Sequence, residues 1–358
     1  MLVLASPMPQ TMTNHYLKTN PMPSILMGLK KYSLLLLLFA FASCQTQDKM
    51  QRLQGDALGT SYNVRYFDTA PNEMISDSID AIFLRINQSM STYWPNAIIS
   101  KVNRDEPITT DVDFKKVFQT AKNIWQQTDG YFDPTVGALV NAYGFGPAKS
   151  LQQIDQAAID SLLNITGFGK VSLLSDGTIN KAHKNTYLDF NAIAKGYAVD
   201  VLASMLHSMG YKQFLVEVGG ELFASGLHPE KEKPWRVAID HPKQNVNRTF
   251  IATLPLQNQG MASSGNYRKF RTDASGKRYV HTINPKTGET VQSNVLSTSV
   301  LSPSTMLADA YATALMAMPY EQGKILISNL STIEAMWVLA VNDGIQVVAT
   351  PGFTYDLE

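Results

Sequence analysis

Four segments of this chain carry apolar residues at helical spacing, and short β-branched runs separate them without a regular strand–helix alternation. Apolar positions three and four apart predict amphipathic helices over 75–90 and 114–125, and further helices are expected over 195–209 and 304–316. Strands are predicted at the short apolar runs 62–66, 214–218, 236–239, 296–301, 336–341 and 345–348. Because no glycine-rich dinucleotide fingerprint leads from a strand into a helix, we expect an α+β fold of mixed sheets with packed helices, in two closely associated lobes.

The composition excludes several classes of protein. With 358 residues, 44% hydrophobic and 17% charged, the chain has enough apolar material for a large core, which rules out intrinsic disorder as its main state. Thirty Lys and Arg balance thirty Asp and Glu, so no basic field favours nucleic acid, and we expect no nucleic-acid partner. One cysteine and six histidines, without HExxH or paired CxxC motifs, exclude an intramolecular disulfide and a structural zinc site.

The single cysteine follows a segment with the order of an export signal. Lys30 and Lys31 precede an apolar run, 34–43, that is shorter than the roughly 20 residues needed to span a bilayer. Phe41 to Cys44 resembles the lipobox of bacterial lipoproteins, in which the cysteine is lipidated. A buried free cysteine is the alternative, but a polar stretch follows Cys44 at once.

This interpretation divides the chain into three parts. Residues 1–43 are expected to be a signal peptide whose true start is Met27, 44–50 a lipidated linker, and 51–358 the functional domain. The protein is then expected to be exported, anchored to a membrane by lipid on Cys44, and to face the periplasm.

The segment from Asp189 to Asp200 leads from a predicted strand into a predicted helix. A lysine at a helix start opposes the helix dipole, so Lys195 is better placed there if an anion such as phosphate lies beside it. Two structural alternatives remain open: Asp189 caps the helix, or Asp189 and Lys195 form a surface ion pair.

A second segment, 307–314, places an acid and a hydroxyl among alanines. Asp309 and Thr313 are four positions apart and so share one helix face. A carboxylate in so apolar a helix should be buried and needs a partner, and this all-oxygen pair suits Mg²⁺ better than zinc. An Asp309–arginine pair with Thr313 bonded to its own helix explains the pattern equally well.

Three weaker patterns complete the candidates. Gly260 to Tyr267 offers amides and hydroxyls to an anion but also fits a plain loop, and His281 is a candidate base or a structural histidine. The aromatic and glycine-rich stretch 129–147, with Tyr93, could wall a planar ligand or pack as turns on the core.

Taken in order, these segments resemble the FAD:protein FMN transferase family, the ApbE-type flavin transferases, from roughly Gly55 to Val341. The residues that carry the resemblance are Leu58-Gly59-Thr60, Ser91-Thr92-Tyr93, Phe132 to Val136, Asp189, Ala194 to Asp200, Ser264 to Tyr267, His281, Pro285 to Gly288, Ala308 to Ala310, and Ala312-Thr313. The resemblance implies an ApbE-like fold and an exported enzyme that splits FAD, attaches FMN by a phosphoester to a threonine of a membrane redox subunit, and releases AMP.

The resemblance also implies a set of site residues. Asp309, Thr313 and the backbone carbonyl of Ala192 would hold Mg²⁺, and His281 or Asp189 would act as the base. The FAD site would be lined by Leu58, Tyr93, Tyr131, Phe132, Asp133, Asp189, Lys195, Ser264 and Ile283. The implied acceptors are threonine-bearing subunits of Na-translocating NADH:quinone reductase or Rnf-type electron-transport complexes. Two other functions fit the same residues: a FAD pyrophosphatase that yields FMN and AMP, and a non-catalytic periplasmic flavin-binding lipoprotein.

Overall fold

The structure is a computed structural model that describes residues 48–358, apart from 153, 243–247, 267–269, 273–277 and 343. The contacts group Asp48–Glu358 as one compact unit. Cys44, Tyr267 and the expected signal peptide lie outside the described residues, so their assignments stay predictions. None of the helices in the described ranges is long and apolar enough to cross a membrane.

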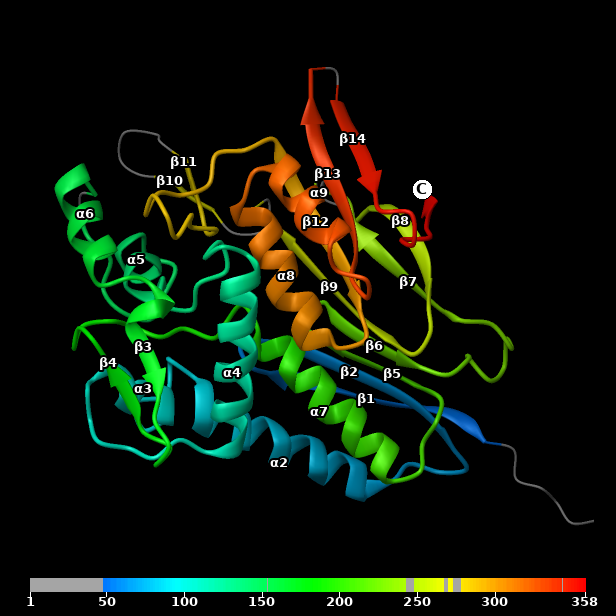
Figure 1. Ribbon diagram of the computed structural model, residues 1–358. Helices are drawn as coiled ribbons and strands as arrows, with labels where there is room; N and C mark the ends of the chain where they lie inside the picture. Colours follow the sequence, from blue (N-terminus) through cyan, green and yellow to red (C-terminus); the bar gives the residue numbers. More distant parts are fainter. Residues whose placement is uncertain (1–47, 153, 243–247, 267–269, 273–277, 343) are drawn as a thin grey trace, which may run out of the picture. The chain divides into compact units, whose positions relative to one another are not determined.

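A large antiparallel sheet forms the centre of this unit (Figure 1). Within the described residues it has eight strands, in the order β1-β2-β5-β6-β9-β12-β13-β14. These strands are β1 (Lys49–Ala57), β2 (Thr60–Asp68), β5 (Phe214–Val218), β6 (Glu221–Ser225), β9 (Gln259–Gly265), β12 (Val295–Ser302), β13 (Glu334–Val341) and β14 (Gly344–Ala349). The order brings β6 and β12 to opposite sides of β9, although the chain separates them widely.

One face of the sheet is covered by helices. Two of them, α7 (Ala194–Ser208) and α8 (Thr305–Ala317), pack on the central strands and on each other, and α2 (Glu73–Met90) and α4 (Val112–Gln127) pack beside them (Figure 1). The apolar stripe of α2 and the inward side chains Val216 and Val218 of β5 belong to the same hydrophobic core. The period-2 alternation of a strand sends Leu215 to the other face.

The opposite face carries a second, smaller core. The strands β7 (Trp235–Asp240), β8 (Phe250–Leu256) and β15 (Asp356–Leu357) form a three-stranded sheet. Its Trp235 and Leu254 pack with Leu215 and Met336 of the large sheet. The large sheet is therefore buried on both faces, which explains why β5 and β13 are nearly continuous apolar runs.

The remaining elements lie to one side of the helical layer (Figure 1). They are α3 (Ile98–Asn103), α5 (Gly137–Ala142), α6 (Gln156–Asn164), the 3-10 turn Phe168–Lys170, β3 (Val171–Leu173), β4 (Ile179–Lys181), β10 (Phe270–Thr272) and β11 (Arg278–Val280). The last helix, α9 (Tyr320–Ser328), instead follows α8 and packs on the sheet, where Tyr320 meets Trp337 of β13. Leu139 of α5 packs with Tyr143 and Ile283 in a third small cluster. That cluster fixes the 281–291 segment beside α5 and α6.

The mixed α+β class is confirmed, as are the four predicted helices and the six predicted strands. Ser304 caps α8 by accepting from the amide of Leu307, and Gly210 follows α7 with a φ of 92°, as its position after a helix end requires. The stretch Gln259–Gly265, for which a loop was one expectation, is strand β9 at the centre of the sheet. Hydrogen bonds to β12 and β6, far away in the sequence, outweigh its weak local strand signal.

Candidate active site

The site is built where the beginning of α7 meets α8. The backbone amide of Gly196, in the first turn of α7, donates to Oδ2 of Asp309 over 3.0 Å. A Cβ added to Gly196 would lie 2.8 Å from the Cβ of Asp309 and 2.8 Å from the Cα of Met306, with the carbonyl oxygen of Thr305 nearer still. Only glycine permits this approach, and the Asp309 carboxylate meets the positive end of the α7 dipole.

Asp200 fixes the start of α8 against α7. Its Oδ1 accepts from the amide of Thr305 at 2.7 Å, and its Oδ2 accepts from the amide of Met306 at 3.0 Å and the hydroxyl of Ser304 at 2.6 Å. These bonds satisfy amides at the helix start, which have no partner within the helix. Asp200 thus sets the position of the helix that carries Asp309, even though burial raises the pKa of this carboxyl.

Two carboxylates and one ammonium occupy this crossing. Asp309 is 3% exposed, and its Oδ1 lies 3.8 Å from Nζ of Lys195. Lys195 also forms an ion pair of 2.6 Å with Oε1 of Glu221, which begins β6 and is 4% exposed. Burial raises the pKa of Glu221 to about 7, and the Lys195 ammonium opposes that rise. The anion expected beside Lys195 is therefore present as protein carboxylate.

Hydroxyl groups extend this polar cluster along α8. Oγ1 of Thr313 lies 3.5 Å from Oγ of Ser264 on β9, and Ser263 bonds to Ser299 at 2.8 Å. Asp309 and Thr313 share one face of α8, as their spacing predicts. The structure thus brings together Lys195, Asp309, Thr313 and Ser264 from α7, α8 and β9.

The donors at this crossing fit a hard cation. Apart from the Lys195 ammonium, the polar side-chain atoms named here are oxygens, and Oε2 of Glu221 has no hydrogen-bond partner within the described residues. A buried carboxylate oxygen without a partner is costly unless a cation or water meets it. The described residues contain no group of three or more His, Cys, Asp or Glu side chains that could hold a metal. The donor set suits Mg²⁺, which keeps waters and ligand phosphates in its shell.

The turn before α7 resolves one alternative for Asp189. Helix α7 has Ile193 at its N-cap, without a side-chain cap bond, so Asp189 does not cap it. Oδ1 of Asp189 instead accepts from the amide of Asn191 at 2.7 Å, a bond that shapes the turn holding Ala192. Burial raises the pKa of Asp189. Burial also raises the pKa of Tyr93, and the Asp189 charge adds to that rise, so the two side chains belong to one electrostatic environment.

The expected FAD-lining residues differ in what their side chains do. Leu58 and Gly59 form the two-residue turn between β1 and β2, where Leu58 has a φ of 52°. A leucine in the left-handed region is strained, and such strain tends to persist at functional sites. Tyr93 is 59% exposed, and the ring of Tyr131 lies 4.4 Å from Nζ of Lys286. Tyr93 is therefore available to a ligand, whereas Leu58 and Tyr131 are partly buried against the main core.

Three others are packed into the protein. Phe132 lies in the main core, and Ile283 in the small cluster beside α5. The carboxylate of Asp133 accepts from the amide and hydroxyl of Thr135, the amide of Phe168 and the indole of Trp125. Their side chains shape the fold around the site, since packing and hydrogen bonds already occupy them.

His281 lies half-buried just before the buried pair Thr282 and Ile283. Its ring is 6.4 Å from that of Phe145 in an edge-on arrangement. The hydroxyl of Thr282 donates to the Asn266 side chain at 2.6 Å, which ties this segment to the end of β9. His281 is therefore joined to the strand that carries Ser264.

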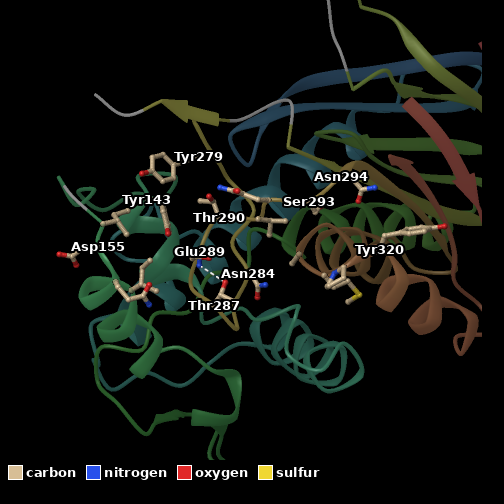
Figure 2. A pocket seen from close by; sticks show the side chains of 18 residues that line it. Tyr143, Asp155, Tyr279, Asn284, Thr287, Glu289, Thr290, Ser293, Asn294 and Tyr320 are labelled. Carbon is tan, nitrogen blue, oxygen red and sulfur yellow. Dashed lines mark hydrogen bonds between the residues drawn. The ribbon is translucent and has the colours of Figure 1, made fainter. Parts of the chain in front are cut away.

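An open cavity lies beyond these residues (Figure 2). It encloses about 630 Å³ between α6, the 284–294 segment and residues 317–320 after α8. Its lining contains none of the predicted metal, FAD or base residues.

Sequence reasoning missed Glu221 and gave Asp200 no role. The sequence could have indicated Glu221, because it is an acid at the start of an apolar strand, and acids are almost never fully buried without a partner. Asp200 follows Lys195 by five positions in the same motif. Its part in capping another helix depends on a contact that local spacing does not reveal.

Comparison with known proteins agrees with this arrangement. The model of the ApbE family matches residues 58–337. The FAD:protein FMN transferase of Haemophilus influenzae is 34% identical over 328 residues, which cover 88% of this chain and 93% of that protein. The protein of that name from Escherichia coli K12 is 31% identical and covers 77% and 80%, respectively.

Solved structures show the same fold. The flavin transferase ApbE from Vibrio cholerae has a TM-score of 0.76 and 31% identity, covering 86% of this chain and 98% of that one. The apo flavinyl transferase ApbE of Pseudomonas stutzeri also has a TM-score of 0.76, with 30% identity and coverage of 86% and 96%. The similarity therefore includes nearly all of the described unit.

Proposed function

The chain belongs to the ApbE family and is an FAD:protein FMN transferase, and on this premise we propose that it uses Mg²⁺, modifies a threonine and releases AMP. The observation that carries the proposal is the buried cluster of Lys195, Glu221 and Asp309 at the α7–α8 crossing. Such a cluster places one fixed ammonium and oxygen ligands where a diphosphate can be held.

Asp309, Thr313 and the carbonyl of Ala192 would hold Mg²⁺, which would neutralise charge on the diphosphate. Lys195 binds a phosphate oxygen, and Glu221 keeps its ammonium in place. Tyr93 and Tyr131 provide aromatic surface for the planar parts of FAD.

The bond changes follow from an in-line displacement at the FMN-side phosphorus. The threonine oxygen forms a new bond to that phosphorus as the P–O bond to the AMP half breaks. His281 or Asp189 takes the hydroxyl proton, and AMP carries away the electron pair of the broken bond. The products are a phosphoester-linked FMN and AMP.

The direct test incubates the purified protein with FAD, Mg²⁺ and the soluble domain of a threonine-bearing subunit of Na-translocating NADH:quinone reductase. Covalent flavin, measured by intact mass, is expected on the acceptor together with stoichiometric AMP. Free FMN and AMP without labelled acceptor would make the enzyme a pyrophosphatase, and persistence of intact FAD would make it a flavin-binding protein.

The metal assignment has a separate test. Asp309→Ala is expected to abolish Mg²⁺-dependent transfer and to reduce Mg²⁺ binding measured by calorimetry in the presence of FAD. Circular dichroism provides the control for folding. A folded variant with an unchanged transfer rate would contradict the assignment.

We also propose that the protein is exported and anchored through lipid on Cys44, facing the periplasm. The order of basic, apolar and small residues before Cys44 supports this location. In cells, Cys44→Ala is expected to move the protein from the membrane fraction to the soluble fraction. Retention of the variant in the membrane fraction would contradict lipid anchoring at this residue.

A further inference from the structure

The open cavity of about 630 Å³ shares two chain segments with the elements that carry the predicted site residues, although none of those residues lines it. Helix α8, which carries Asp309 and Thr313, ends at Ala317, and residues 317–320 form one wall. The other wall is the 284–294 segment, which directly follows His281 and Ile283. The cavity is therefore lined by the residues that follow directly after α8 and after the segment with His281 and Ile283.

Contacts within the protein join the two walls. Thr313 on α8 meets Ser264 on β9, and two residues later Asn266 accepts from Thr282. Asn284, two residues after Thr282, lines the cavity. Through these side chains, the position of the 284–294 wall depends on β9 and α8.

The lining does not suit a diphosphate. The described residues around the cavity include the acids Asp155 and Glu289 and no Lys, Arg or His. Carboxylates repel phosphate, and no cation in the cavity lining offsets them; at the α7–α8 crossing Lys195 offsets one of the two carboxylates, and bound Mg²⁺ would offset the other. The FAD diphosphate therefore belongs at the crossing, and the cavity is left for a different group.

The lining does suit a polypeptide segment. Neutral hydrogen-bonding side chains, among them Gln292, Ser293 and Asn294, share the lining with three tyrosines. Tyr143 and Tyr279 lie on one side of the view in Figure 2, and Tyr320 lies on the other side with Asn294. Amide and hydroxyl side chains can pair with peptide NH and C=O groups, while tyrosines supply rigid contact area at low entropic cost, as in antibody binding loops. The volume lies within the usual range for ligand pockets, roughly 300–1,000 Å³.

We propose that this cavity binds the segment of the acceptor protein that carries the nucleophilic threonine. The proposal rests on the transferase function, which needs a second substrate next to the diphosphate but outside the FAD site. A polypeptide held between the 284–294 segment and residues 317–320 would contact the chain three residues after His281 on one side and the end of α8 on the other. The cavity thus selects the acceptor, while the crossing binds FAD.

The test fills the cavity without changing the proposed catalytic residues. Gln292→Trp and Asn294→Trp, singly and together, place bulk on exposed lining positions whose side chains form no hydrogen bond to the described residues. Gln346→Trp, on an exposed position of the edge strand β14, is the matched control. The probe is the fluorescently labelled soluble domain of the same quinone-reductase subunit.

Binding of this probe is measured by anisotropy, and FAD binding by flavin fluorescence. For the double variant we expect the acceptor Kd and KM to rise at least about tenfold, which corresponds to ~1.4 kcal/mol, with the FAD Kd within about twofold of wild type. Retained FAD binding also shows that the variant is folded. Gln346→Trp is expected to change neither value.

Three results would overturn the proposal. A weaker FAD Kd with unchanged acceptor binding would assign the cavity to the nucleotide. Unchanged Kd values for both the acceptor and FAD would show that the cavity binds neither of them. A loss of self-association in sedimentation, with unchanged acceptor binding, would make the cavity an interface between copies of this chain. Because the anisotropy assay needs no turnover, a wild-type protein that binds the acceptor but transfers no flavin would contradict the proposed function and not the cavity assignment.

Discussion

The close approach of α7 and α8 at Gly196 gives a quantitative prediction. In Gly196→Ala the new Cβ would lie 2.8 Å from the Cβ of Asp309 and from the Cα of Met306. Carbon atoms pack best at about 3.5–4.0 Å, so the helices must separate by roughly 0.7 Å or more. The neighbouring atoms belong to the backbone or to a Cβ, and no flexible side-chain end can move away instead.

The expected cost follows from this rigidity. Overpacking a core costs about 1–3 kcal/mol, and we expect the upper part of that range because both helices must shift. At roughly 2–4 °C per kcal/mol, a cost of about 2–3 kcal/mol should lower the melting temperature by about 4–12 °C. The shift also moves Asp309, so Mg²⁺ affinity in the presence of FAD should fall roughly tenfold, or ~1.4 kcal/mol.

The assay combines thermal unfolding without metal and calorimetric titration of Mg²⁺ with FAD present. Gly169→Ala is the matched control, because its Cβ would make ordinary contacts at 3.4 and 3.7 Å with the ring of Trp125. The control should keep both values close to wild type. If Gly196→Ala melts at the wild-type temperature and binds Mg²⁺ equally well, then the crossing is not the rigid element that positions Asp309.

Other changes test the surroundings of the site. Glu221→Gln removes the anionic partner of Lys195 but keeps its size, so kcat/KM for FAD should fall about tenfold while the protein stays folded; an unchanged kcat/KM would show that Lys195 needs no such partner. Because burial raises the pKa of Asp200 above 3.8, the folded state holds this proton more tightly than the unfolded chain, and its contribution to stability should fall as pH rises above that value. Urea unfolding should therefore show a larger stability advantage of wild type over Asp200→Asn at about pH 4 than at about pH 7, and an equal or reversed advantage would refute this. Lys286→Met loses an exposed ion pair and a cation–π contact with Tyr131, so the free energy of unfolding should fall by less than about 1 kcal/mol in urea; a larger loss would make Lys286 a main support of its turn.

The helices, and the position of Asp309 and Thr313 on one helix face, could be predicted because they depend on local spacing. The apolar stripe of 75–90 identifies a buried helix face, and a carboxylate among alanines in 307–314 indicates a buried charge that needs a partner. Local spacing also places Lys195 in the first turn of a helix. These statements require no knowledge of which strands are neighbours.

Long-range contacts set the limit of sequence prediction at Glu221. That residue contacts Lys195 because β6 lies next to β9 beneath both helices. The apolar pattern of a strand predicts which of its faces is buried but not which strands are its neighbours. Leu58 was identified by resemblance alone, because leucine gives no turn signal although it occupies a turn position with positive φ. The roles of Phe132 and Asp133 also needed the structure, since a motif does not say whether a side chain points toward a ligand or into the core.

The charges at the α7–α8 crossing explain why distant motifs must act together. Glu221, whose pKa burial raises to about 7, and Asp309 share the single Lys195 ammonium, so ionisation of both carboxyl groups would leave one negative charge without an offset. Uncompensated charge in a site of low dielectric is expensive, so the arrangement favours a cation over an additional anion until a metal is present. If Mg²⁺ binds here as proposed, a diphosphate would be held most tightly together with its cation, and metal and FAD binding would depend on each other. Gly196 and Asp200 would affect this coupling without touching either ligand, because they set how closely the helix carrying Asp309 approaches Lys195.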